Sequence, residues 1–161
     1  METENFKTLI VKEIETQRNR LGEISLKIHS NPELGFKEEK AAELLTGYLE
    51  EKGFSVDRGI CRLPTAFRAN YGTGKPYIAL LAEYDALPDL GHACGHNIIA
   101  TSAVGAAVAS KIAIDRFGGS IQVIGTPAEE LYGGKVLMAE EGAFDNLDIA
   151  MIIHPGGMDS A

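Results

Sequence analysis

The sequence predicts an α/β fold in which helices flank a mostly parallel sheet. Strand-like and helix-like patterns alternate along the second half of the chain, which favours parallel strands joined by crossover helices. Residues 77–83 form a nearly continuous apolar run, as expected of a central strand buried on both faces. Hydrophobic residues make up 45% of the chain and charged residues 24%, which is typical of folded globular proteins.

The N-terminal third is expected to be helical and the rest to alternate. Apolar residues recur at helical spacing over residues 4–29 and 36–52, and Gly53 suits the C-terminal cap of the second helix. The remaining elements are expected as strands at 54–57, 65–70, 77–83, 120–126 and 148–153, and as helices at 96–115 and 135–142.

Composition and charge exclude several classes of partner. A length of 161 residues suits about one domain. The formal net charge of −8 would repel a phosphate backbone, so nucleic acid is not expected as a partner. The apolar stretch 98–114 contains polar residues and many alanines, and we interpret it as a buried helix rather than a membrane span. Two cysteines and the absence of a signal-peptide pattern favour a cytoplasmic protein.

Three loops that directly follow expected strands hold most of the reactive side chains. They carry Cys94 and His96, then Glu129 and Glu130, and finally His154. Because loops at the carboxyl ends of parallel strands meet at one crevice, we expect these side chains to converge. Thiolate, imidazole and carboxylate groups together are ligands that zinc and manganese accept. The pattern therefore predicts a divalent metal site.

Spacing within the loops suggests separate roles. Glu129 and Glu130 would diverge in extended backbone, so that one binds metal and the other serves as a general base. Cys94 precedes a helix, whose dipole would favour the thiolate. His92 and Asp85 could orient a ligand. Each residue alone also has an ordinary structural explanation, such as burial of a small cysteine or solvation of a glutamate pair.

Four segments resemble a known family in order and spacing. They are HSNPELGFKEEKAA from His29, EYDALPDLGHACGHN from Glu83, GTPAEELYGGK from Gly125 and IIHPG from Ile152. The sequence resembles the co-catalytic metallopeptidases of the aminoacylase and glutamate carboxypeptidase family (metallopeptidase family 20), in its amidohydrolase branch. The GHACGHN form is most similar to the aminobenzoyl-glutamate and β-alanyl-dipeptide members. The resemblance implies a three-layer, zinc-exopeptidase-like fold.

The resemblance also implies roles for individual residues. It implies two divalent metal ions, zinc or manganese, and the ligands Cys94, His96, Glu130 and His154. Glu129 would be the general base, and Asp85 would be the carboxylate of the family's His-x-Asp motif. Glu83 stands at the position of that motif's histidine, where His96 would take over as ligand. His92 would lie near the substrate.

The implied activity is hydrolysis of the amide bond of N-acyl amino acids or dipeptides, with homodimers in the full-length form. The family's last metal-binding histidine, its inserted lid domain and its return segment have no counterpart in residues 1–161. We therefore expect the N-terminal part of a catalytic domain, with little turnover of its own. Two alternatives stay open: a non-catalytic binding or regulatory module, and a metal-free hydrolase with Cys94 as nucleophile, which chelation would leave active.

Overall fold

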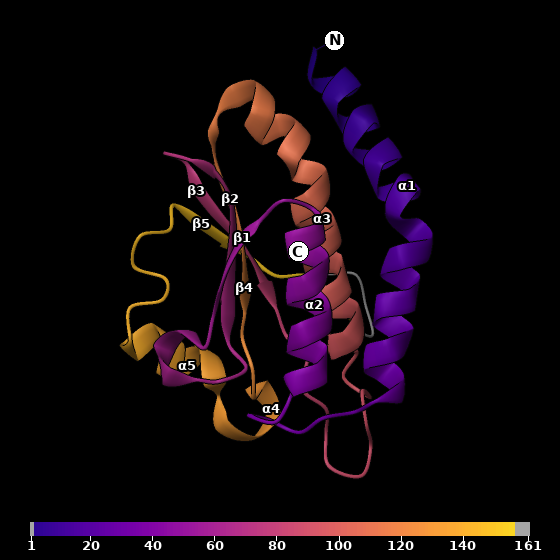
Figure 1. Cartoon of the computed structure of the whole chain (residues 1–161), viewed down its shortest axis with the longest axis vertical. Coiled ribbons are helices and arrows are strands. Elements are labelled where there is room, and N and C mark those ends of the chain that lie inside the picture. The colour runs from indigo at the N-terminus through magenta and orange to yellow at the C-terminus, as the bar shows by residue number, and fades with distance from the viewer. Residues whose placement is uncertain (1, 157–161) are drawn as a thin grey trace.

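The computed structural model describes residues 2–156 and shows one sheet with helices on both faces (Figure 1). Its five strands are β1 (Ser55–Arg58), β2 (Phe67–Thr73), β3 (Tyr77–Ala82), β4 (Gly119–Gly125) and β5 (Ile149–Met151). The helices are α1 (Glu2–Ser30), α2 (Glu39–Glu51), α3 (His96–Phe117), α4 (Glu129–Tyr132) and α5 (Gly134–Glu140), with a 3₁₀ turn η1 (Ile60–Arg62). The α/β class predicted from the sequence is confirmed.

The sheet is mixed, with the order β1-β2-β4-β3-β5. β3 pairs in parallel with both β4 and β5, whereas β2 pairs antiparallel with β1 and β4. β2 extends beyond the strand expected at 65–70 into residues 71–73, because these residues pair with residues 119–121 of β4. The three parallel strands are neighbours, so their carboxyl ends lie together at one edge of the sheet.

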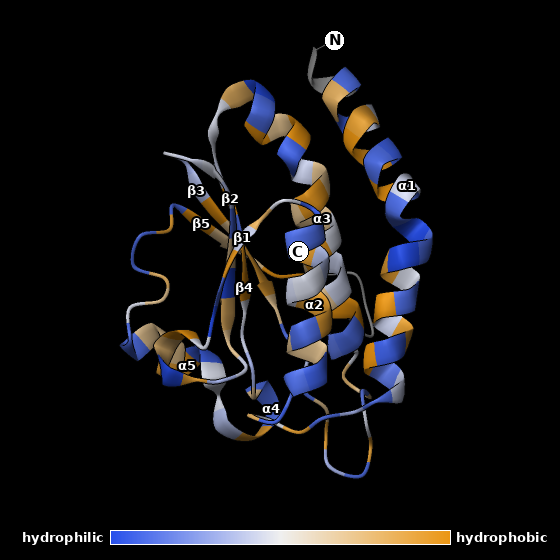
Figure 2. Cartoon of the chain, viewed as in Figure 1, coloured by the Kyte–Doolittle hydropathy of each residue, from blue (hydrophilic) through white to orange (hydrophobic). Residues whose placement is uncertain are grey.

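Each face of the sheet has its own apolar core, because successive strand residues point to opposite faces. On β3, Ile78 and Leu80 pack in the larger core with α1, α2 and α3, while Ala79 and Leu81 pack in a smaller one with Met138 of α5. Figure 2 shows hydrophobic residues in the parallel strands β3, β4 and β5, whereas the outer helix α1 mixes hydrophilic and hydrophobic residues. The protein therefore has three layers.

The central helix α3 is the most apolar helix among the described residues. By length and hydropathy alone it could cross a membrane, and it is the one helix in residues 2–156 that meets this test. Within the protein, 56% of its most apolar window is buried, against α1 on one side and the sheet on the other. A helix packed into a protein core meets the same test, so the apolar character of α3 is explained by packing.

Candidate metal centre

The predicted loops meet at the edge where β3, β4 and β5 end. Glu83 follows directly after β3, and His154 lies three residues after β5. Glu129 and Glu130 begin α4, which follows β4, and His96 begins α3. Three parallel strands and one helix N-terminus thus bring together residues that are far apart in the sequence.

Gly95 lets two of these loops touch. It adopts a φ of +78°, and a Cβ atom there would lie 2.9 Å from Cγ of Pro155. A side chain would therefore strain the backbone and push the β5 loop away. With glycine in place, the His154 and His96 rings approach to 5.9 Å between centroids, nearly perpendicular to each other.

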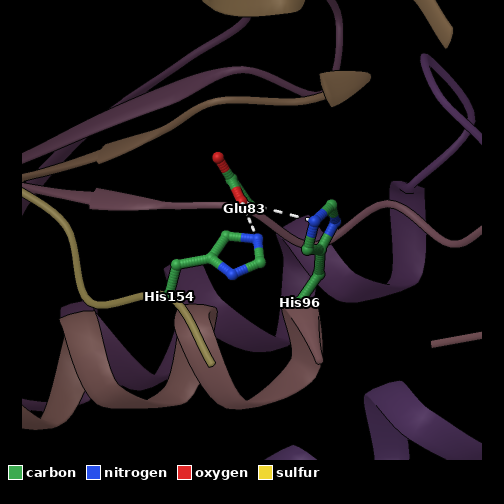
Figure 3. Close-up of side chains that lie close together, drawn as sticks. All are labelled: Glu83, His96 and His154. Atoms are coloured by element: carbon green, nitrogen blue, oxygen red, sulfur yellow. Dashed lines mark ion pairs between the residues drawn. The ribbon is translucent and has the colours of Figure 1, made fainter. Parts of the chain in front are cut away.

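One group of candidate ligands comprises Glu83, His96 and His154 (Figure 3). The Oε2 atom of Glu83 lies 3.3 Å from Nε2 of His96 and 3.9 Å from Nε2 of His154. Glu83 and His96 are buried, whereas the side chain of His154 is 49% exposed. These groups can converge on one cation that is reached from the solvent on the His154 side.

A second group comprises Cys94, His96 and Glu130, whose ligand atoms all lie within 4.8 Å of one another. Oε1 of Glu130 is 3.4 Å from Nε2 of His96. His96 belongs to both groups, so the two sets of donors share one imidazole. The four ligands expected from the sequence, together with Glu83, therefore form two overlapping clusters.

Asp85 fixes the orientation of the shared imidazole. Nδ1 of His96 lies 2.9 Å from the backbone carbonyl oxygen of Asp85 and 3.1 Å from its Oδ1. A carbonyl oxygen only accepts hydrogen bonds, so Nδ1 carries the proton and Nε2 faces Glu83 and Glu130. The other carboxylate oxygen, Oδ2, accepts a hydrogen bond from the backbone N–H of Glu130 at 3.1 Å. Asp85 thus ties the β3 loop to α3 and α4.

The carboxylates determine the charge state of their neighbours. Burial disfavours the imidazolium form of His96, but Asp85 and Glu83 outweigh it and raise the pKa of His96. For Cys94, a hydrogen bond with Glu130, burial and the surrounding carboxylates raise the thiol pKa to about 11. These neighbours shift the thiol pKa in the direction opposite to the one expected from the helix dipole.

The two adjacent glutamates diverge, although the local geometry differs from our expectation. They begin a short helix rather than continuing a strand, since Ala128 before them adopts a left-handed conformation. Glu130 points to the Cys94 group, whereas Glu129 makes an ion pair with Lys135 and lies outside both donor groups. The two carboxylates therefore have different partners, and their expected roles as ligand and base stay a prediction.

His92 lies beside this centre and not in it. Its side chain is 8% exposed, and its ring centroid is 6.3 Å from that of His29. Neither ring nitrogen has a hydrogen-bond partner among the described residues. Burial, together with the charges of His96 and His29, lowers the pKa of His92. His92 lines a hollow that it shares with Cys94 and His154.

Sequence reasoning missed three residues of this centre. Glu83 was noted only as a departure from the family motif, although its position directly after a buried strand was an available signal. Lys135, which contacts Glu83 and Glu129, was quoted in a motif without a role. Glu38 was also quoted in a motif without a role, because its importance depends on residues distant in the sequence.

Glu38 anchors the loop that carries the glutamate pair. It is fully buried, and its two carboxylate oxygens accept hydrogen bonds of 2.8 Å from the Ala128 backbone N–H and the Thr65 hydroxyl. Burial raises the pKa of Glu38 even though these hydrogen bonds oppose the shift. Glu38 therefore stabilises the left-handed turn that starts α4.

Replacing Glu38 by alanine is expected to lower the free energy of unfolding by about 2–4 kcal/mol. The change removes two buried hydrogen bonds to a carboxylate and leaves the Ala128 N–H without its partner. Urea denaturation followed by circular dichroism measures the loss. The control is Glu43, which is exposed on α2, the helix that Glu38 precedes, since Glu43→Ala should change the unfolding free energy by less than about 0.5 kcal/mol. Equal effects of the two variants would contradict the anchoring role.

The donor set fits a divalent cation. Nε2 of His96 and Oε2 of Glu83 are buried and have no hydrogen-bond partner among the described residues, yet they face each other. Buried polar atoms normally have a hydrogen-bond partner or a bound ion. Two such atoms that face each other without one therefore indicate a site for a bound cation. Nitrogen, sulfur and oxygen donors at this spacing suit a transition metal ion.

Comparison with known proteins identifies the family. The model of peptidase family M20/M25/M40 matches residues 79–160, which is about half of the chain and includes all three loops of the centre. The chain belongs to this family. Three of the four motifs from which the resemblance was inferred lie within the matched residues, and the family prediction is confirmed.

Curated M20 relatives are longer than this chain. A subunit of p-aminobenzoyl-glutamate hydrolase from Escherichia coli is 41% identical over 88% of this chain and 34% of its own length. Xaa-Arg dipeptidase from mouse is 39% identical over 99% of this chain and 40% of its own length. The chain thus spans about a third to two fifths of the curated relatives it matches.

Solved M20 structures share the fold. The YxeP protein of Bacillus subtilis, described as a dinuclear metal-binding peptidase from the M20 family, superposes with a TM-score of 0.76 at 26% identity. The match covers 86% of this chain and 43% of that protein. The arrangement of sheet and helices described above is therefore the family's arrangement.

Proposed function

We propose that this chain carries the metal centre of a divalent-metal-dependent amidohydrolase. The single observation that carries the proposal is the pair of overlapping donor groups, Glu83–His96–His154 and Cys94–His96–Glu130, at the end of three parallel strands. Membership of the M20 family supports it. Cys94, His96, Glu130 and His154 are the ligands inferred from the sequence, and Glu83 adds a fifth donor.

The charge of the centre supports two cations rather than one. The carboxylates of Glu83, Asp85, Glu129 and Glu130 and a Cys94 thiolate would carry five negative charges. Lys135 offsets one of them. The four that remain equal the charge of two divalent ions, and zinc or manganese would suit the mixed donors. Cations near Cys94 would also favour its thiolate, which the neighbouring carboxylates alone disfavour.

The chain's own side chains would bind the metal ions and transfer a proton. Bound divalent cations supply Lewis-acid polarisation of a carbonyl and a lower pKa for water. Glu129, which is outside both donor groups, accepts the proton of the attacking water and returns it to the leaving amine. Asp85 keeps the Nδ1–H of His96 in place, so that Nε2 stays directed at the metal.

The proposed substrates are small molecules with an amide bond, namely N-acyl amino acids or dipeptides. The names of the relatives support aminobenzoyl-glutamate and dipeptides as substrate types. His92 is proposed to contact the substrate, because its unpartnered ring lines a hollow that adjoins Cys94 and His154.

Other properties inferred from the sequence stay proposals. We propose a cytoplasmic location, since Cys61 and Cys94 are both free thiols. We propose a homodimer in the full-length form, and we propose that residues 1–161 supply the N-terminal part of the catalytic domain. The shares of the relatives' lengths that the chain covers support the last point.

The structure disfavours the alternative in which Cys94 is a nucleophile. A catalytic cysteine needs a lowered thiol pKa and a basic partner. Here the pKa of Cys94 is about 11, and its hydrogen bond is with the carboxylate of Glu130. These features disfavour direct attack by the thiol, whereas the place of Cys94 in a donor group supports metal binding.

The proposal is tested by stripping the chain with a chelator and adding Zn²⁺ or Mn²⁺. We expect calorimetry and elemental analysis to show two bound equivalents. We expect hydrolysis of p-aminobenzoyl-glutamate or of arginine-ended dipeptides by the full-length form, and the little turnover of residues 1–161, to require them. A chain that binds no metal would contradict the proposal. Hydrolysis that survives chelation but is lost on thiol alkylation would instead support the nucleophilic alternative.

A further inference from the structure

Lys135 lies at the centre because of the two glycines that precede it. Gly133 adopts a φ of +59°, and a Cβ atom on Gly134 would lie 1.8 Å from the backbone oxygen of Pro127. Only glycine at position 134 allows α5 to begin so close to the loop before the glutamate pair. As the second residue of α5, Lys135 thereby comes within reach of β3 and α4.

The ammonium group of Lys135 bridges two carboxylates. It makes ion pairs with Oε1 of Glu83 and with Oε2 of Glu129. The side chain of Lys135 is 24% exposed and that of Glu83 only 4%, so the Glu83 contact is shielded from water. Such shielded, charge-assisted contacts are stronger than surface ion pairs.

This bridge occupies one carboxylate oxygen of Glu83 and one of Glu129. Glu83 keeps Oε1 on Lys135, which leaves Oε2 for His96 and His154. Glu129 is held by Lys135 from the side of α5 and is absent from both donor groups. Without Lys135, the nearby carboxylates would have free oxygens that a dication could bind.

We propose that Lys135 is a positioning residue that keeps Glu83 a one-oxygen ligand and keeps Glu129 off the metal. This inference rests on the proposed function. Its consequence is that Lys135 weakens metal binding, because its charge opposes the cations and occupies potential ligand atoms. In exchange, Glu129 stays free to accept a proton.

The test measures Co²⁺ binding to the full chain, by calorimetry and by the visible absorption of the bound ion. Lys135→Met should bind Co²⁺ about tenfold more tightly and show weaker visible bands, as added carboxylate oxygens raise the coordination number. Lys135→Arg should restore the wild-type affinity and spectrum. Lys75→Met is the matched control, since Lys75 pairs with Asp148 on the surface, and it should change neither.

Each result decides the question. If wild type binds Co²⁺ and Lys135→Met has the same or lower affinity with an unchanged spectrum, the inference is wrong while the proposed function stands. If wild type binds no Co²⁺, both are wrong. Should Lys135→Met fail to fold, Lys135→Gln, which keeps a hydrogen-bond donor and removes the charge, should show the same tighter binding.

Discussion

Replacing His96 by alanine is expected to remove all bound metal from the chain at micromolar concentrations. His96 is the imidazole that both donor groups share, so its loss leaves two donors in each group. Changes to groups that only orient a ligand already cost about 10–100-fold in metal affinity. Loss of a shared ligand should therefore exceed about 100-fold for both ions. Elemental analysis after dialysis measures the effect.

The His29→Ala variant is the control for His96→Ala. His29 is an exposed histidine at the end of α1 and belongs to neither donor group. Its replacement should leave the metal content unchanged. If His96→Ala keeps one full equivalent, the donor groups are independent, and the shared-ligand arrangement is wrong.

Replacing Glu129 by glutamine should lower the rate of amide hydrolysis by about 10²–10⁴-fold while the metal content stays the same. Glutamine keeps the shape of the side chain but accepts no proton at neutral pH. Glu129 is outside both donor groups, so the variant keeps every proposed metal ligand. The rate is measured on the metal-loaded full-length form with the substrates proposed above, because residues 1–161 alone are expected to have little turnover.

Two further variants separate the roles of the glutamates. Glu130→Gln should lose metal, because Glu130 is a member of the Cys94 group. Glu140→Gln, an exposed change on α5, should alter neither metal content nor rate. If Glu129→Gln loses metal and Glu130→Gln retains it, the roles of base and ligand are exchanged.

The positions of the site residues in the fold were predictable from local sequence. Glu130 and His154 follow short apolar strands, and the ends of neighbouring parallel strands meet at one edge, so convergence followed from topology. The antiparallel pairing of β2 with β4 did not follow, because strand direction depends on partners far apart in the sequence.

The electrostatics of the site were harder to predict from the sequence. The expected Cys94 thiolate rested on one local feature, the following helix, while its pKa depends on Glu130, Asp85 and Glu83 from other segments. Lys135 escaped notice for the same reason, since its partners include Glu83, 52 residues earlier. Charges act through space, and a sequence read locally does not show which of them are neighbours.

A cation held by both His96 and His154 would also act as a crosslink. β5 is the edge strand, it pairs with β3 through only three residues, and Ile149 and Met151 remain about half exposed. Asp148 holds the start of the strand through Lys75 and the backbone of Tyr77. The binding energy of the metal would thus partly become the energy that fastens this strand. In such a protein, loss of the metal would loosen the attachment of β5, and loosening of β5 would weaken metal binding.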